Sequence, residues 1–312
     1  MPRCYHGSDM KVIRSRLLGF CMGVRRAVDM ALSESSPGGC TIYTLGPLIH
    51  NPRVLEDLEK RGVKILGEGE FPSASENATV IIRAHGVPPL VEEELARRGT
   101  RVLDATCPHV KASQKKARSF AEKGYRIFLA GEKNHGEVTG IRGYVEAAAA
   151  PKGEASAGAA PQGVCWIVGS PEEAAKAGSE LSRLEPSAKT VLIGQTTISS
   201  AEYSAIAEQL RRNFPDMEIL DTICGGAHAD RQEALRELCG KADAVIVAGG
   251  RESANTRRLL NLALELGKPA WLVEKPEDLP PEIANYRTVG LGAGASTPDS
   301  LIDEIEEALK TK

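Results

Sequence analysis

Short apolar runs alternate with amphipathic stretches along most of the chain, a pattern typical of β-strands followed by helices. The run 78–82 (ATVII) consists of apolar residues and one threonine, and 89–99 (PLVEEELARRG) then carries apolar residues at helical spacing. Asn51 followed by Pro52 is a helix start, and Gly62 is a helix end. Strands alternating with helices of this size predict an α/β fold with parallel sheets.

Three cysteines lie where a predicted strand meets a helix, and they mark a repeat: Cys21, Cys107 and Cys224. A polar loop follows each of them at nearly the same distance, with His50 at 29 residues, His135 at 28 and Ser253 at 29. A second polar site follows each cysteine at 64, 89 and 72 residues: His85, Thr196 and Ser296. The matched spacings predict three copies of one α/β unit.

The repeat predicts three α/β units, 10–106, 107–221 and 222–312, in a pseudo-threefold arrangement. The longer spacing in the middle unit comes from 146–163, an Ala/Gly/Pro-rich segment without periodicity, which we expect to be a flexible surface insertion. Ligands of parallel sheets bind beyond the carboxyl ends of the strands, where the cysteines and polar loops are expected. We therefore expect the three thiolates to converge at one centre.

Three thiolates without short local spacing suit an iron–sulfur cluster better than zinc, which usually takes four closely spaced ligands in structural sites. A cubane held by three cysteines leaves one iron free to act as a Lewis acid. The alternative for any single cysteine is a small buried apolar residue. The remaining cysteines lack the strand-end context and are expected to be structural or incidental: Cys4, Cys40, Cys165 and Cys239.

The polar loops carry neutral hydrogen-bond donors suited to a phosphate or diphosphate. His50 and His85 lie just before predicted helices, whose N-termini favour anions. Ser253, Asn255 and Ser296 add hydroxyl and amide groups. The chain has no Walker A motif and no GxGxxG after a strand, so a standard nucleotide site is not expected.

Glu137 follows His135 in the segment NHGEV and adds a carboxylate to this set. If the segment were extended, the two side chains would project to one face. Burial near an anion would raise the pKa of the carboxyl and allow it to deliver protons. An exposed surface glutamate is the alternative.

Net charge, hydropathy and cysteine count exclude several classes of protein. The formal net charge of −3, with no strongly basic region, argues against a nucleic-acid binder. The polar start of the chain lacks the apolar core of a signal peptide, and no window is apolar enough for a membrane span, so a cytoplasmic location is expected. Seven cysteines, an odd number, make a disulfide framework improbable in that compartment.

From about residue 12 to the C-terminus, eight ordered motifs resemble the 4-hydroxy-3-methylbut-2-enyl diphosphate reductase family, the last enzyme of the methylerythritol phosphate route to isoprenoids. The motifs are GFCMGV, GPLIHN, RAHGV, DATCP, GEKNHGEV, QTTIS, DTIC and AGAST. The resemblance implies a [4Fe–4S] cluster on the three cysteines and ferredoxin or flavodoxin as electron donor. It also implies a small-molecule diphosphate substrate, with neither nucleic acid nor membrane as a partner.

The resemblance implies a role for each polar residue. Glu137 and Thr196 would be catalytic: they would orient and protonate the substrate hydroxyl, which would bind the unique iron. C–O cleavage would then give isopentenyl and dimethylallyl diphosphate. The substrate-binding residues would be His50, His85, His135, Thr196, Ser253, Asn255 and Ser296.

The sequence departs from the family pattern at Ala227 and Ala254, where hydroxyl side chains are usual, and Glu252 would repel a diphosphate unless it points away. Weaker substrate binding is expected, because a lost charge-assisted hydrogen bond is worth roughly 1.5–3 kcal/mol. A non-catalytic iron–sulfur redox sensor or electron carrier is the alternative function. A zinc-bound diphosphate-binding module is a third.

Overall fold

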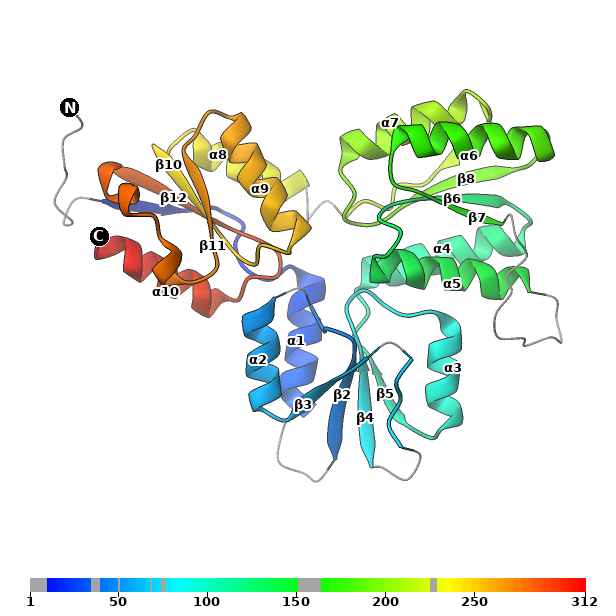
Figure 1. The fold of residues 1–312 in the computed structure, drawn as a ribbon, viewed down its shortest axis with the longest axis horizontal. Helices are drawn as coiled ribbons and strands as arrows, with labels where there is room; N and C mark the ends of the chain where they lie inside the picture. The colour runs from blue at the N-terminus through cyan, green and yellow to red at the C-terminus, as the bar shows by residue number, and fades with distance from the viewer. Residues whose placement is uncertain are drawn as a thin grey trace. The chain divides into compact units, whose positions relative to one another are not determined.

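Three sheets organise the chain in the computed structural model, which describes residues 10–34, 40–49, 51–67, 69–73, 77–150, 164–224 and 229–312 (Figure 1). Each sheet has four strands, and all strand pairs are parallel. The α/β fold class with parallel sheets is thereby confirmed. In the described part of the chain, no helix has the length and apolar content to cross a membrane.

The strands fall into three groups along the chain. The first sheet contains β2 (Thr41–Leu45), β3 (Val63–Leu66), β4 (Ala78–Ile82) and β5 (Arg101–Asp104). The second contains β6 (Arg126–Ala130), β7 (Cys165–Val168), β8 (Thr190–Gly194) and β9 (Glu218–Ile219). The third contains β1 (Lys11–Arg14), β10 (Ala244–Ala248), β11 (Ala270–Val273) and β12 (Thr288–Ala293).

One strand order recurs in all three sheets: β3-β2-β4-β5, β7-β6-β8-β9 and β11-β10-β12-β1. The fourth strand of the third sheet therefore comes from the N-terminus, where Val12 pairs with Val289. Each fourth strand leads into one of the three cysteines of the repeat. Strand pairing thus divides the chain differently from the ranges 10–106, 107–221 and 222–312, because β1 belongs with the C-terminal strands.

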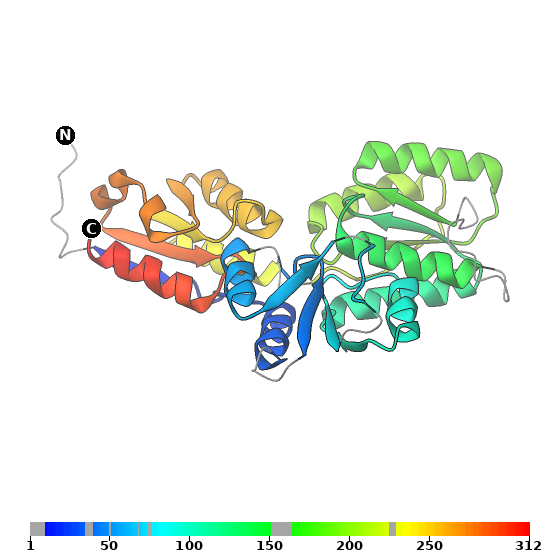
Figure 2. The same ribbon diagram turned by 60° about the horizontal axis from the view of Figure 1, so that its bottom comes forward.

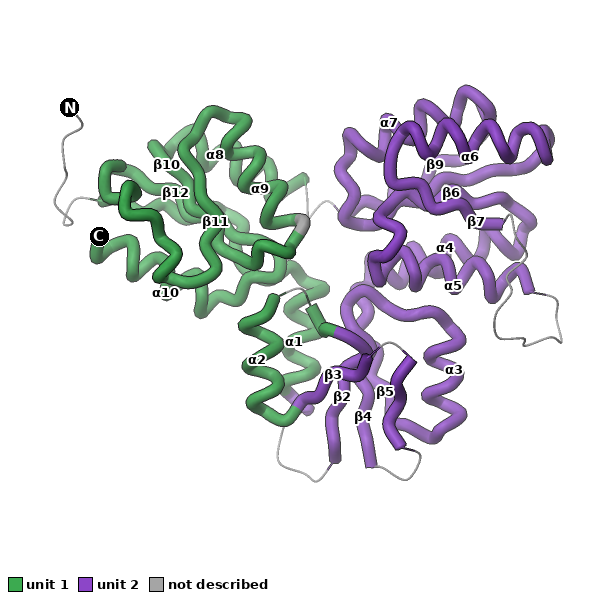
Figure 3. Tube along the Cα trace, in the orientation of Figure 1, with its two compact units in different colours: residues 1–32, 47–62, 225–312 green, residues 33–46, 63–224 purple. Residues whose placement is uncertain are grey.

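Backbone contacts divide the chain into two compact units (Figure 3). Unit 1 comprises 1–32, 47–62 and 225–312, and unit 2 comprises 33–46 and 63–224. The third sheet lies in unit 1, and the first and second sheets lie in unit 2.

Ten α-helices connect the strands within the described ranges. They are α1 (Met22–Glu34), α2 (Pro52–Lys60), α3 (Pro89–Arg97), α4 (Pro108–Glu122), α5 (Gly136–Ala149), α6 (Pro171–Leu184), α7 (Ser200–Arg211), α8 (Ala229–Cys239), α9 (Ala254–Glu265) and α10 (Asp299–Lys310). Two short 3₁₀ helices, η2 (Pro276–Asp278) and η3 (Pro281–Asn285), precede β12. Four α-helices begin with proline, whose fixed φ and missing N–H suit the first helical position.

Helices cover both faces of the second and third sheets (Figures 1 and 2). On the second sheet, Phe128 and Leu192 pack toward α6 and α7, whereas their neighbours Ile127 and Val191 pack toward α4 and α5. In the third sheet, Ile246 joins a cluster with α10 and Val247 joins one with α8 and α9. Successive residues of a strand face opposite sides, so strands covered on both faces are continuously apolar.

Several elements escaped the sequence analysis. Strands β3, β7 and β11 are only four residues long, and β7 and α6 follow the Ala/Gly/Pro-rich segment directly. The expected insertion 146–163 begins inside α5, which continues to Ala149 because alanine favours helix. Residues 151–163 lie outside the described ranges.

Thr222 joins the end of β8 to the segment before Cys224. Its hydroxyl accepts the N–H of Gly194 and donates to the carbonyl of the same residue, both at 2.9 Å. We predict that Thr222→Val lowers the free energy of unfolding by about 1–3 kcal/mol, since it leaves buried backbone groups unpaired. Urea unfolding measures the loss. The exposed Thr139→Val is the control, and equal stability of the two variants would contradict the prediction.

Candidate functional site

The three cysteines occupy equivalent positions at the ends of the fourth strands. Their backbone N–H groups donate to carbonyl oxygens just beyond the neighbouring strand, each at 2.9 Å. The pairs are Cys21 with Ala295, Cys107 with Ala84, and Cys224 with Thr196. Each bond therefore ties a cysteine to the loop that carries the second polar site of its sheet.

The side chains of these cysteines are half-buried and, among the described residues, form no disulfide; the same holds for Cys40 and Cys165. Cys239 differs, because it is 2% exposed and burial raises the pKa of its thiol. It lies in the apolar cluster under α8, as expected for a structural cysteine. Among the described residues, no three His, Cys, Asp or Glu side chains form a group able to hold a metal ion.

His85 and His135 lie together in unit 2. Their ring centroids are 5.1 Å apart and the rings meet edge to face. His135 is the N-cap of α5, and its Nδ1 accepts the N–H of Glu137 at 3.2 Å. In the neutral ring this bond leaves the proton on Nε2, which can donate to an anion.

The segment around Glu137 is helical rather than extended. His135 caps α5 and Glu137 lies in its first turn, so the expectation that both side chains share the face of an extended segment is wrong. Gly136 and the free N–H groups that follow it favour a helix start, and the histidine supplies the cap.

Glu137 is buried, 1% exposed, and Thr196 holds its carboxylate. One oxygen accepts the backbone N–H of Thr196 at 2.6 Å, and the other accepts its hydroxyl at 2.9 Å. Burial raises the pKa of Glu137 to about 7, although the two bonds from Thr196 oppose the shift. The carbonyl of Thr196 accepts the N–H of Cys224, so acid, threonine and cysteine form one connected set.

In unit 1, the loops after β10 and β12 carry the remaining described polar residues. Ser253 caps α9 by accepting the N–H of Thr256, and its own hydroxyl proton can still be donated. Ser253 and Ser296 are buried, and Asn255 is half-buried in the first turn of α9. The two loops pack closely, since a Cβ on Gly294 would lie 2.2 Å from the Thr256 hydroxyl.

Three residues considered in the sequence analysis lie outside the described residues: Cys4, His50 and Ala227. The neighbour of His50 is described: Asn51 is 3% exposed and its side chain accepts the N–H of Val54 at 3.2 Å. It caps α2 as predicted. Glu252, expected to repel a diphosphate unless it points away, is exposed to solvent.

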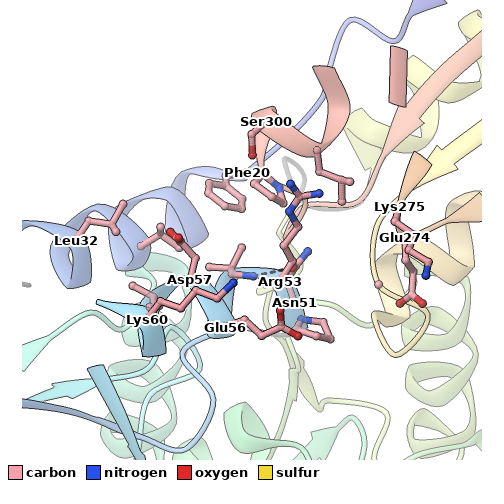
Figure 4. Close-up of a pocket in the computed structure, with 17 residues that line it drawn as sticks. Phe20, Leu32, Asn51, Arg53, Glu56, Asp57, Lys60, Glu274, Lys275 and Ser300 are labelled. Atoms are coloured by element: carbon pink, nitrogen blue, oxygen red, sulfur yellow. Dashed lines mark hydrogen bonds between the residues drawn. The ribbon is translucent and has the colours of Figure 1, made fainter. Parts of the chain in front are cut away.

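A cavity of about 740 Å³ lies within unit 1, between α1, α2 and the start of α10 (Figure 4). Asn51 and Gly250 line it, so it adjoins the start of α2 and the loop that carries Ser253. Its charges are mixed, and its central Arg53 pairs with Glu304 of α10 at 2.7 Å. This lining does not distinguish an anionic ligand from a cationic one.

Three further side chains of unit 2 lie near the site residues of that unit, and the sequence analysis did not assign them a role: Gln195, Gln114 and Arg83. Gln195 accepts the N–H of Glu132 and donates to Thr197, which joins the loops after β6 and β8. Gln114 is fully buried on α4, and neither polar atom of its amide has a hydrogen-bond partner. Arg83 lies two residues before His85. Gln195 and Arg83 lie inside the quoted motifs QTTIS and RAHGV, which is the signal that could have revealed them.

The comparisons with known proteins cover nearly the whole chain. The family model described as LytB protein matches residues 12–310. A 4-hydroxy-3-methylbut-2-enyl diphosphate reductase of Treponema pallidum is 45% identical over 97% of this chain and 84% of its own length. The reductase of the same name from Treponema denticola is 43% identical over 96% and 99%.

Solved structures agree with these relatives. A structure of (E)-4-hydroxy-3-methyl-but-2-enyl diphosphate reductase, the terminal enzyme of the non-mevalonate pathway, is 34% identical, covers 97% of this chain and 100% of that one, and has a TM-score of 0.72. The E-1-hydroxy-2-methyl-but-2-enyl-4-diphosphate reductase from Plasmodium falciparum is 26% identical, covers 96% and 87%, and has a TM-score of 0.80. The chain belongs to the LytB protein family.

Proposed function

We propose that this chain is a 4-hydroxy-3-methylbut-2-enyl diphosphate reductase. The reaction replaces the allylic C–O bond of the substrate by a C–H bond, consumes two electrons and two protons, and releases water with isopentenyl or dimethylallyl diphosphate. The observation that carries the proposal is the buried Glu137–Thr196 pair, whose threonine is hydrogen-bonded to Cys224. A proton donor fixed beside a half-buried thiol suits a reductive dehydroxylation.

The donor set fits an iron–sulfur cluster. Cys21, Cys107 and Cys224 share one strand-end position and one pattern of backbone hydrogen bonding, and their side chains are half-buried and form no disulfide among the described residues. We propose that they hold a [4Fe–4S] cluster. When bound, the cluster supplies electrons one at a time and an iron without a protein thiolate as a Lewis acid for the substrate hydroxyl.

Ferredoxin or flavodoxin is the proposed electron donor and the cytoplasm the proposed location. Both rest on the family relationship.

Hydrogen-bond donors at strand ends are proposed to bind the diphosphate. The imidazole Nε2 of His135 and the hydroxyl of Ser253 can each donate at the start of a helix, where the macrodipole also favours an anion. The proposed ligands are His50, His85, His135, Thr196, Ser253, Asn255 and Ser296.

Glu137 is proposed to be the general acid. With a pKa of about 7, a substantial fraction of its carboxyl groups holds a proton at neutral pH. The carboxyl itself is almost inaccessible, but the Thr196 hydroxyl 2.9 Å away can accept that proton and pass its own to the substrate oxygen. Protonation turns the hydroxyl into water as the C–O bond breaks. Thr196 also fixes the orientation of the acid.

An anaerobic activity assay with 4-hydroxy-3-methylbut-2-enyl diphosphate as the substrate tests the proposal. We expect protein with a reconstituted cluster to form isopentenyl and dimethylallyl diphosphate when given a one-electron reductant. A cluster-loaded protein that transfers electrons without consuming the substrate would instead be an iron–sulfur carrier. Metal analysis that finds zinc without iron or sulfide would indicate the zinc module.

Glu137→Gln separates proton transfer from the other functions of the site. We predict that kcat falls by about 10²-fold or more, because the amide cannot donate a carboxyl proton, while cluster content and substrate affinity persist. The exposed Glu132→Gln in the preceding loop is the control. Turnover of Glu137→Gln near that of the control would remove Glu137 from the role of acid.

The raised pKa of Glu137 also makes stability depend on pH. The native carboxyl binds its proton more tightly than the unfolded one, so this contribution is complete below about pH 4.5 and is lost as pH rises through about 7. We predict that wild type loses about 3 kcal/mol relative to Glu137→Gln across that window. Urea unfolding at several pH values measures the difference. The exposed Glu208→Gln should follow wild type, and parallel curves for wild type and Glu137→Gln would contradict the shift.

Cys107→Ala tests the proposed cluster. We predict that the variant binds no cluster, since two thiolates cannot hold a cubane whose fourth corner is left for substrate. Iron and sulfide analysis with the visible spectrum measures the loss. Cys40→Ala, which changes a half-buried cysteine outside the set, should retain the cluster. Absorbance of Cys107→Ala near that of the parent protein would disprove the assignment.

A further inference from the structure

Arg83 is a cationic side chain in the site of unit 2 without a role so far. It follows β4 directly and lies two residues before His85. Strand β4 is an inner strand of the first sheet, between β2 and β5. Its carboxyl end is therefore in the region where parallel sheets bind their ligands. The side chain is half-buried.

Two glycines make room for the guanidinium. A Cβ built on Gly136 would lie 2.5 Å from Nη2 and 2.8 Å from Cζ of Arg83, and a Cβ on Gly46 would lie 2.8 Å from Nη1. Real Cβ atoms do not approach other atoms this closely, so the guanidinium lies directly against both backbones. Gly46 follows β2 directly and has a φ of +70°, and Gly136 is the first residue of α5. Arg83 thus contacts two strand-end loops besides its own.

The position of this charge is unusual for a helix start. The N-terminus of α5 carries the positive end of the helix dipole, which favours carboxylates and disfavours cations. Here Arg83 lies against its first residue, and the rings of His85 and His135 lie 5.1 Å apart nearby. The carboxylate of the first turn, Glu137, directs both oxygens to Thr196. A polyanion bound at this point would contact the guanidinium of Arg83 and both imidazoles together.

We propose that Arg83 binds the diphosphate of the substrate beside His85 and His135. The inference rests on the proposed function and adds a permanently charged ligand to a set that otherwise consists of histidines and neutral groups. A guanidinium suits this task because its planar fork can donate two parallel hydrogen bonds to phosphate oxygens and does not lose its proton in proteins.

Inorganic diphosphate is the probe, used as a competitive inhibitor of the cluster-loaded enzyme. We expect Arg83→Gln to raise both KM and the Ki of diphosphate by about 10- to 100-fold, the range for one lost charge-assisted hydrogen bond, with kcat within about 3-fold of wild type. Arg83→Lys keeps the charge without the fork, and we expect a rise of about 3- to 10-fold. Unchanged KM and Ki in Arg83→Gln overturn the proposal.

The control is Arg101→Gln, which removes the same charge from the amino end of the neighbouring strand β5, where Arg101 pairs with Glu34. It should leave Ki unchanged, and a rise equal to that of Arg83→Gln would indicate an effect of net charge and overturn the proposal. If Arg83→Gln fails to fold or to hold a cluster, an unchanged Ki in Arg83→Lys overturns it.

If the chain were not a reductase, the experiments would show this separately from a failure of the Arg83 proposal. Wild-type enzyme without turnover would reject the reductase, and calorimetry with inorganic diphosphate on the same cluster-loaded protein would still test Arg83. Weaker binding by Arg83→Gln than by Arg101→Gln would support the anion site, and equal binding would reject it.

Discussion

Three backbone hydrogen bonds fix each cysteine of the repeat beside a polar loop of its own sheet. In each sheet, the N–H of a cysteine continues the ladder beyond the fourth strand and reaches the loop after its neighbour. The bond fixes the Cα of the cysteine relative to that loop, whatever the thiol binds. Because His85, Thr196 and Ser296 lie in those loops or next to the accepting carbonyls, the same bond positions a thiol and a polar group together.

The sequence predicted the repeat because strand ends carry recognisable residues. The spacing of cysteines and polar loops, the cap at Asn51 and the glycine after α2 all follow from local rules. The choice of which strands pair with each other does not follow from local rules. Nothing within residues 11–14 specifies that β1 pairs with β12, since that choice depends on a sheet edge formed more than 270 residues later in the chain. The very short strands β3, β7 and β11 also carry too few residues for a clear period.

The site shows the same division between local and tertiary information. The family resemblance indicated Glu137 and Thr196 as a pair. The pKa of the carboxyl depends on burial, which only the packing of α5 against the second sheet establishes. The helical start at Gly136 was missed because its cap is a histidine, an uncommon N-cap residue. Arg83 was missed because the position of its guanidinium depends on two glycines of other loops, Gly46 and Gly136, which leave space for it.

The pairing of β1 with β12 has a consequence for biosynthesis. The ribosome releases β1 before the other described strands and its partner β12 after all of them. The nascent chain can complete the first and second sheets while it is still being extended, but the ladder that holds Cys21 forms only after the C-terminal strand has emerged. Any factor that requires all three cysteines in their folded positions therefore meets them only after β12 has emerged.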